Sequence, residues 1–244
     1  MSRITTIMKR ELGAYFATPV AYVFIVIFLF LTGIFTFYVG NFYERNQADL
    51  EPFFRFHPWL YMLLIPAISM RLWSEERKTG SLELLMTLPV TLWEAVIGKF
   101  LAAWCFTAVA LAMTFPVWIT VNYLGHPDNT VIIAGYVGSL LMAGGFLAVG
   151  SCISALTKNQ VIAFVVSFVI CFAFNLAGFP IVLDIFRAVV PQTVLNAIAS
   201  FSFLTHFSSI QKGVIDLRDF VFFASLIAFW LYASTLAIEA KKSS

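Results

Sequence analysis

The segment Arg71-Leu-Trp-Ser-Glu-Glu-Arg-Lys-Thr-Gly-Ser-Leu-Glu-Leu-Leu-Met-Thr-Leu-Pro89 is rich in charge and lies between two long apolar runs. It then runs on to Gly98-Lys99. A charged segment that can form a helix between two membrane spans is a place where a membrane protein can be pushed from outside the bilayer. We therefore interpret residues 74–99 as a coupling segment.

The local signals in this segment predict a short rigid lever. A helix can start at Gly80-Ser81, and its apolar side chains at i, i+3 and i+4 share one face: Leu82, Leu85 and Met86. Pro89 ends that helix, and Thr91-Leu-Trp-Glu94 has the spacing of a capping box that begins the next one. The alternative interpretation is an ordinary solvated loop, with the side chain of Lys99 extending to the membrane surface.

The composition excludes a soluble domain. Apolar residues make up 61% of the 244 residues and charged residues 11%, against about 45–50% and about 25% in soluble domains. A span needs about 20 apolar residues, and such runs must be helical in lipid. The sequence therefore predicts an all-α integral membrane protein, one domain over 1–244, with six transmembrane helices at about 20–40, 58–73, 100–123, 131–155, 160–183 and 219–238.

The distribution of Lys and Arg predicts the orientation. With both termini in the cytoplasm, ten of these residues lie inside: Arg3, Lys9, Arg10, Arg71, Arg77, Lys78, Lys99, Lys158, Lys241 and Lys242. Five lie outside: Arg45, Arg55, Arg187, Lys212 and Arg218. This excess satisfies the positive-inside rule. The first apolar run is too long for a cleavable signal and is expected to be a signal anchor, starting with Thr18 as N-cap and Pro19 at the first helical position.

Two segments outside the spans are expected to be helical. Residues 1–17 have apolar side chains at helical spacing and Lys9, Arg10 and Glu11 between them, which predicts an amphipathic helix on the cytoplasmic membrane face. A plain basic anchor is the alternative. The outer segment 184–218 is long, half apolar and broken by Pro191, so it is expected to contain short helices. In the fourth span, Gly150 and Ser154 have the small-residue spacing that lets helices approach closely.

The sequence lacks the residues that other functions need. No ionisable residue lies in the middle of a predicted span, which disfavours a secondary transporter, the main alternative function. No nucleophile has a base to activate it, so an intramembrane enzyme is also disfavoured and no catalytic residues are assigned. The scattered His and Cys residues predict no metal site. A phosphate-binding loop is missing as well, so energy for driven work must enter from a partner.

The run Arg71–Val90, the sequence Gly98-Lys99-Phe-Leu-Ala102 and the N-terminal Lys9-Arg10-Glu11-Leu12 resemble the signature of ABC-2 type permeases. The subgroup that the chain is most similar to is the gliding-motility permease subunits (GldF-like), and more distantly the nitrous-oxide-reductase maturation permeases (NosY-like). The segment 206–220 resembles the outer-face motif of the gliding subgroup, with His206, Gly213, Asp216, Arg218 and Asp219. Ser81 stands where these relatives more often have Thr.

The resemblance implies the type V ABC exporter fold, with an interfacial N-terminal helix, a coupling helix between spans 2 and 3 and short re-entrant outer helices between spans 5 and 6. The coupling residues would be Glu75, Glu76, Arg77, Lys78, Gly80, Ser81, Leu82, Glu83, Leu85 and Met86. The implied partners are an ABC ATPase that binds ATP and Mg²⁺, a second or homologous permease, membrane lipid and a subunit with a large periplasmic domain. The resemblance implies the bacterial inner membrane, with no cofactor on this chain and no nucleic acid.

Overall fold

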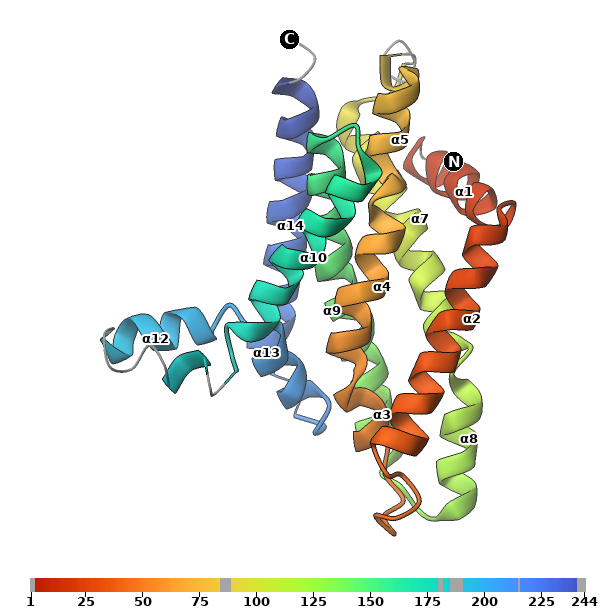
Figure 1. The fold of residues 1–244 in the computed structure, drawn as a ribbon, viewed down its shortest axis with the longest axis vertical. Coiled ribbons are helices and arrows are strands. Elements are labelled where there is room, and N and C mark those ends of the chain that lie inside the picture. The colour runs from red at the N-terminus through yellow and green to blue at the C-terminus, as the bar shows by residue number, and fades with distance from the viewer. Residues whose placement is uncertain (1–2, 84–88, 180–181, 185–190, 215, 241–244) are drawn as a thin grey trace.

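The computed structural model describes residues 3–83, 89–179, 182–184, 191–214 and 216–240, and among these it contains helices and turns but no strand. Figure 1 shows the helices as an elongated bundle with α12 projecting from its side. The elements are α1 (Arg3–Phe16), α2 (Pro19–Ile34) with the π-helical turn η1 (Phe35–Val39), α3 (Glu51–Arg55), α4 (His57–Ser69), α5 (Arg71–Thr79), α7 (Leu92–Ala112), α8 (Phe115–Leu124), α9 (Asn129–Leu156), α10 (Gln160–Leu176), α12 (Gln192–Ala199), α13 (Phe203–Ile210) and α14 (Leu217–Ala240).

Within the described ranges, four helical segments are long and apolar enough to cross a membrane: Pro19–Val39, Leu92–Leu124, Asn129–Leu156 and Leu217–Ala240. They correspond to the first, third, fourth and sixth predicted runs. The fifth run is helical as α10 but ends at Leu176, short of the expected boundary at residue 183. The chain there passes so close to α13 that a Cβ on Gly178 would lie 2.3 Å from Ser202 Oγ. The second run is divided between α4 and α5, so the count of six spans stays a prediction.

The third predicted span is interrupted. The break at Met113 and Thr114 separates α7 from α8, because Pro116 has no N–H to bond to the carbonyl of Ala112 and its ring would crowd that carbonyl. The hydroxyl of Thr114 donates to the carbonyl of Leu111 at 2.6 Å and lies 2.9 Å from the hydroxyl of Tyr136. The hydroxyl groups of Thr114 and Tyr136 thus have hydrogen-bond partners where the apolar helix is interrupted.

Helix α9 is the centre of the bundle and packs against α4, α5, α7, α10, α13 and α14. Small residues make this packing possible. A Cβ added at Gly150 would lie 1.9 Å from the hydroxyl oxygen of Ser69 on α4, and one at Gly144 would lie 3.0 Å from Ile227 on α14 and 3.1 Å from Trp104 on α7. The close helix approach predicted from the small-residue spacing in this span is therefore confirmed.

Both ends of the described chain lie at one end of the bundle. Figure 1 shows α1, α5 and the C-terminal end of α14 there, and α3, α8 and α13 at the opposite end. Thr18 and Pro19 begin α2 as predicted, although the Thr18 hydroxyl donates back to the carbonyl of Tyr15 at 2.9 Å rather than capping the new helix. This turn lets α1 leave the bundle axis and lie across its end (Figure 1).

Candidate functional site

The start of α5 is fastened to α9 through two serine hydroxyls. The indole Nε1 of Trp73 donates to Ser151 Oγ at 3.1 Å, and the ring is fully buried. The backbone N–H groups of Trp73 and Ser74 donate to Ser154 Oγ at 3.0 and 3.1 Å. First-turn N–H groups have no partner within their own helix, so α9 supplies the acceptor that α5 lacks. The Ser154 hydroxyl in turn donates to the carbonyl of Met70 at 2.9 Å.

A second contact holds α5 to the C-terminal end of α9. Arg77 Nη1 donates to the carbonyl oxygen of Ala155 at 2.6 Å. Carbonyls in the last turn of a helix lack intrahelical partners and carry the negative end of the helix dipole, so a guanidinium there is favourable. Together with the serine contacts, this bond makes α5 a rigid extension of the bundle rather than a free loop.

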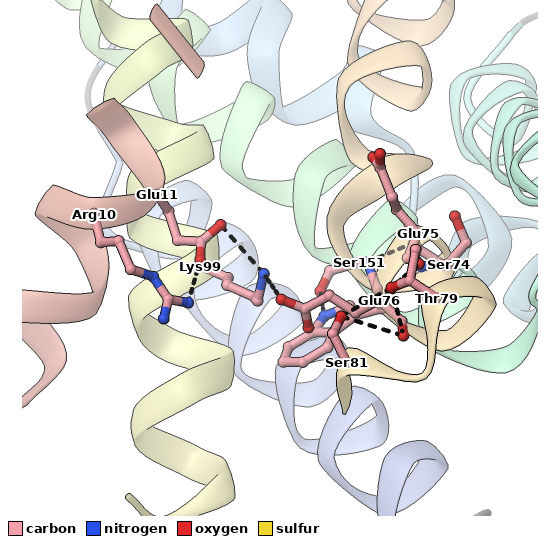
Figure 2. Close-up of polar contacts among 11 residues, drawn as sticks. Arg10, Glu11, Ser74, Glu75, Glu76, Thr79, Ser81, Lys99 and Ser151 are labelled. Atoms are coloured by element: carbon pink, nitrogen blue, oxygen red, sulfur yellow. Dashed lines mark hydrogen bonds and ion pairs between the residues drawn. The ribbon is translucent and has the colours of Figure 1, made fainter. Parts of the chain in front are cut away.

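Lys99 connects three helices at this end of the bundle. It projects from α7, and its ammonium lies 3.2 Å from Glu11 Oε2 on α1 and 2.8 Å from Glu76 Oε1 on α5. Figure 2 shows Lys99 between the two carboxylates. The side chain of Lys99 is only 4% exposed, and its ammonium lies 5.3 Å from the centre of the Trp73 ring. We call Glu11, Glu76 and Lys99 the ion triad.

Helix α1 reaches the triad because α7 has a glycine where the two helices cross. A Cβ on Gly98 would lie 2.8 Å from Ile7 Cγ2, so any larger residue would push α1 away. Further along, the Tyr15 ring stacks on Phe106 with centroids 5.3 Å apart. These contacts fix α1 along α7 and set Glu11 beside Lys99.

The electrostatics favour ionised Glu11. Burial raises the pKa of its carboxyl, but the Lys99 ammonium and the Arg10 guanidinium, 2.6 Å away, together lower it by more, so the net pKa lies below the usual value. Pairing of buried charges is what makes their removal from water tolerable. The triad therefore joins α1, α5 and α7 through side chains of opposite formal charge.

The predicted coupling residues do not form one charged patch. Glu75 pairs with Arg71 at 3.0 Å, Glu76 faces Lys99, and Arg77 reaches α9. Lys78 is exposed, and Gly80 ends α5 in the left-handed conformation with φ of 75°. That conformation is typical of a glycine at a helix C-terminus.

The rest of the coupling segment is described in part. Residues 81–83, which include Ser81, Leu82 and Glu83, are helical, as predicted for a helix after Gly80. Leu85 and Met86 lie in 84–88, outside the described residues. The predicted capping box is confirmed: the Glu94 N–H donates to Thr91 Oγ1 at 3.3 Å, and the Thr91 N–H donates to Glu94 Oε2 at 2.8 Å. Of the N-terminal candidates, Lys9 and Arg10 are exposed, and Glu11 joins the triad.

The predicted outer-face motif lies at the opposite end of the bundle. His206 Nδ1 lies 2.5 Å from Asp219 Oδ1, and His206 Nε2 lies 2.9 Å from the carbonyl oxygen of Ser200. Asp216 Oδ1 accepts the N–H of Arg218 at 3.1 Å at the start of α14. Gly213 has φ of 82° and packs against Val131. The motif thus joins α13 to α14 and α9.

The sequence predictions missed the residues that connect α1, α5, α7 and α9 at the end of the bundle that carries the coupling segment. We call this end the coupling end. Lys99, Trp73, Ser151 and Ser154 were not among the candidate site residues, and the side chain of Lys99 points inward rather than to the membrane surface. The available signals were the Gly98-Lys99 pair and the serines spaced three apart on α9. Within the described ranges, no three His, Cys, Asp or Glu residues are grouped so that they could hold a metal ion.

Comparison with known proteins gives one family. Residues 6–217 match the family model described as ABC-2 family transporter protein. The match covers α1 from residue 6 onward, the whole coupling segment and the first three residues of the outer-face motif. Among curated proteins, none matches this chain.

Proposed function

Because the chain belongs to the ABC-2 family of transporter proteins, and is therefore a multi-pass membrane permease component of an ABC transporter, we propose that it converts ATP hydrolysis by a separate ATPase into transport or mechanical work. The ATPase, which binds ATP and Mg²⁺, docks on the coupling segment 74–99. This chain has no phosphate-binding loop of its own.

One observation carries the proposal: the coupling segment is rigidly joined to the bundle. Ser154 and Ser151 of α9 hold Trp73, and Lys99 ties Glu76 of α5 to Glu11 of α1. A force applied to the exposed tip of α5 reaches α1, α7 and α9 through polar contacts of about 3 Å. A solvated loop would absorb such a force by changing its own shape.

The proposed docking surface is the tip that extends beyond these contacts. It comprises the exposed Lys78, Thr79 and Gly80 and the helical residues 81–83. Glu76 has an internal role in this proposal, because its side chain faces Lys99. Glu75 remains a docking candidate, since its side chain is 47% exposed although it pairs with Arg71.

The proposed topology has six spans in the bacterial inner membrane with both termini in the cytoplasm. The spans are the six runs predicted from the sequence, in one ABC-2 domain over 1–244. In support, Figure 1 shows α1 and the C-terminal end of α14 at the same end of the bundle, as an even number of crossings requires. Helices α12 and α13 would then lie in the outer segment. The ten-to-five excess of Lys and Arg also favours this orientation.

The proposed assembly contains two permeases and two ATPase subunits. The second permease is another copy or a homologue, and a subunit with a large periplasmic domain belongs to the complex if the protein is of the gliding type. The motif at His206, Gly213, Asp216, Arg218 and Asp219 supports that subgroup over the NosY-like one. The matching family description does not distinguish between them.

The test is co-purification with the genetically linked ATPase, using substitutions at the tip. Lys78→Glu should leave membrane abundance normal but reduce retention of the ATPase or its stimulation, because it changes the docking surface and not the bundle. Gly80→Trp should reduce ATPase retention too, and it also strains the backbone at the end of α5, since Gly80 has φ of 75°. Lys212→Glu is the matched control, since Lys212 is exposed at the opposite end. Wild-type assembly and activity in both tip variants would refute coupling through this segment. ATP hydrolysis by the purified chain alone would refute the separate ATPase.

A further inference from the structure

A cavity of about 510 Å³ lies between α1, α2, α4, α5 and α7. Most of its apolar lining comes from α2 and α4, including Val23, Ile27, Leu64 and Ala67. Its charged lining comes from α1, α5 and α7, which meet at the end of the bundle, and consists of Glu11, Arg71, Glu75, Glu76 and Lys99. Small-molecule sites typically have volumes of about 300–1,000 Å³. This cavity has that size and is apolar along its length and charged at one end.

The cavity opens along a helix surface suited to lipid. Val20, Val23 and Ile27 line it, yet they are 54%, 56% and 41% exposed. They recur at i, i+3 and i+7 on α2, part of a segment long and apolar enough to cross a membrane. In a bilayer this opening faces acyl chains rather than water. An amphiphile can therefore enter sideways without exposing its apolar part.

The charged side chains that are accessible at the polar end of the cavity indicate which lipid head group it can bind. The ammonium of Lys99 already contacts Glu11 and Glu76 and is buried. Arg71 and Glu75 are more open, with side chains 36% and 47% exposed. Arg71 uses Nε and Nη2 to bond Glu75, which leaves donors of its five N–H groups for a phosphate. The Glu75 carboxylate can accept from an ammonium group.

The net charge of the lining argues against an anionic lipid. Three carboxylates and two cations line the cavity, so the lining carries a net formal charge of −1. A phosphate with its own ammonium group adds no net charge, and both of its charged groups find a partner. Choline has no N–H to donate to Glu75, and a glycerol head group leaves the phosphate charge uncompensated.

We propose that this cavity binds one phospholipid with a primary ammonium head group, of the phosphatidylethanolamine type. Its phosphate lies on Arg71, its ammonium on Glu75 and one acyl chain between α2 and α4. The cavity is also lined by Tyr15 of α1, Leu72 of α5 and Phe106 of α7, so a lipid that fills it lies against all three helices that the ion triad connects. It would brace the coupling end from the membrane side. This site does not depend on the proposed ATPase or on any transported substrate.

The head-group preference can be measured on the purified full-length chain by native mass spectrometry. The detergent-solubilised protein is mixed with equal amounts of dipalmitoyl phosphatidylethanolamine and dipalmitoyl phosphatidylcholine. We expect about three- to tenfold more of the ethanolamine lipid on the protein, since one charge-assisted hydrogen bond is lost with choline at a partly exposed site. Glu75→Gln should remove most of this preference. Equal retention of the two lipids, retention of neither, or stronger retention of dipalmitoyl phosphatidylglycerol would overturn the proposal.

The location can be tested with variants that fill the cavity. Ala67→Phe occupies the apolar part and Ile27→Trp obstructs the opening, so each should lose most of the bound ethanolamine lipid. Ala228→Phe on α14 is the matched control, because Ala228 is exposed and does not line the cavity. Ile27 lies at the exposed mouth, so its variant decides the matter if Ala67→Phe fails to fold. Wild-type lipid retention in Ile27→Trp would show that the lipid binds elsewhere.

Discussion

Replacing Lys99 by Met should destabilise the coupling end of the protein more than any exposed charge substitution. The Lys99 ammonium lies 3.2 Å from Glu11 and 2.8 Å from Glu76. Methionine has a similar length but no charge, so the variant removes the Lys99 counter-ion from Glu76 and leaves Glu11 paired with the exposed Arg10 guanidinium, 2.6 Å away. Breaking a fully buried ion pair costs about 3–5 kcal/mol. The carboxylates are 18% and 21% exposed, and we therefore expect about 2–3 kcal/mol.

Thermal unfolding of the purified chain, followed by tryptophan fluorescence, measures this loss. For a chain of about this size, 1 kcal/mol corresponds to roughly 2–4 °C in Tm, so Lys99→Met should lower Tm by about 4–12 °C. The matched control is the triple variant Glu11→Gln, Glu76→Gln, Lys99→Met, which removes all three charges together. It should recover more than half of the loss, because neutral replacement of a whole ion cluster is often tolerated.

Two results would refute the reasoning. A Tm for Lys99→Met within about 1 °C of the wild type would mean that the triad contributes nothing to the folded state. A triple variant as unstable as the single variant would mean that Lys99 stabilises the bundle by packing on Trp73 rather than by charge.

Three further predictions concern acid stability, helix packing and topology. Because the pKa of Glu11 is lower in the folded than in the unfolded protein, the stability that ionised Glu11 contributes is present above the ordinary carboxyl pKa and is lost as pH falls below about 4. In Tm measurements from pH 3 to 7, Glu11→Gln should therefore reduce the fall of Tm at acid pH. An unchanged fall of Tm would contradict the ionic role of Glu11. Gly150→Ala puts a Cβ 1.9 Å from a serine hydroxyl of α4 and should lower both Tm and the yield of folded protein. Gly33→Ala is the control and should lower neither, because a Cβ at Gly33 has no neighbouring atom within 4 Å. Equal yields and Tm values for the two variants would disprove the close packing of α9 on α4. A cysteine replacing Lys158 should react with an impermeant maleimide only from the cytoplasm and one replacing Lys212 only from outside; labelling of both from the same side would exclude the proposed topology.

Much of the architecture follows from local patterns in the sequence. Length and apolarity predicted the long helices α9 and α14, because a run of about 20 apolar residues has few alternatives to a helix in lipid. The capping box at Thr91 was predicted because capping is decided within one turn. The entry into α2 was predicted because proline suits the first helical position, where Pro19 stands. The small residues of α9 predicted close packing but not which helices it would involve.

The tertiary structure alone decided which charges face inward. In the sequence, Glu75 and Glu76 are adjacent and chemically alike, and nothing in a linear pattern separates a docking charge from an internal one. The fold turns Glu76 toward Lys99, 23 positions later, and brings in Glu11 from a helix 88 positions before Lys99. Such pairing depends on the angle at which α1 crosses α7 at Gly98 and on the register of α5 against α9. Both are set by side-chain packing between distant segments, because the free energy of an ion pair depends on distance and burial in space and not on separation along the chain.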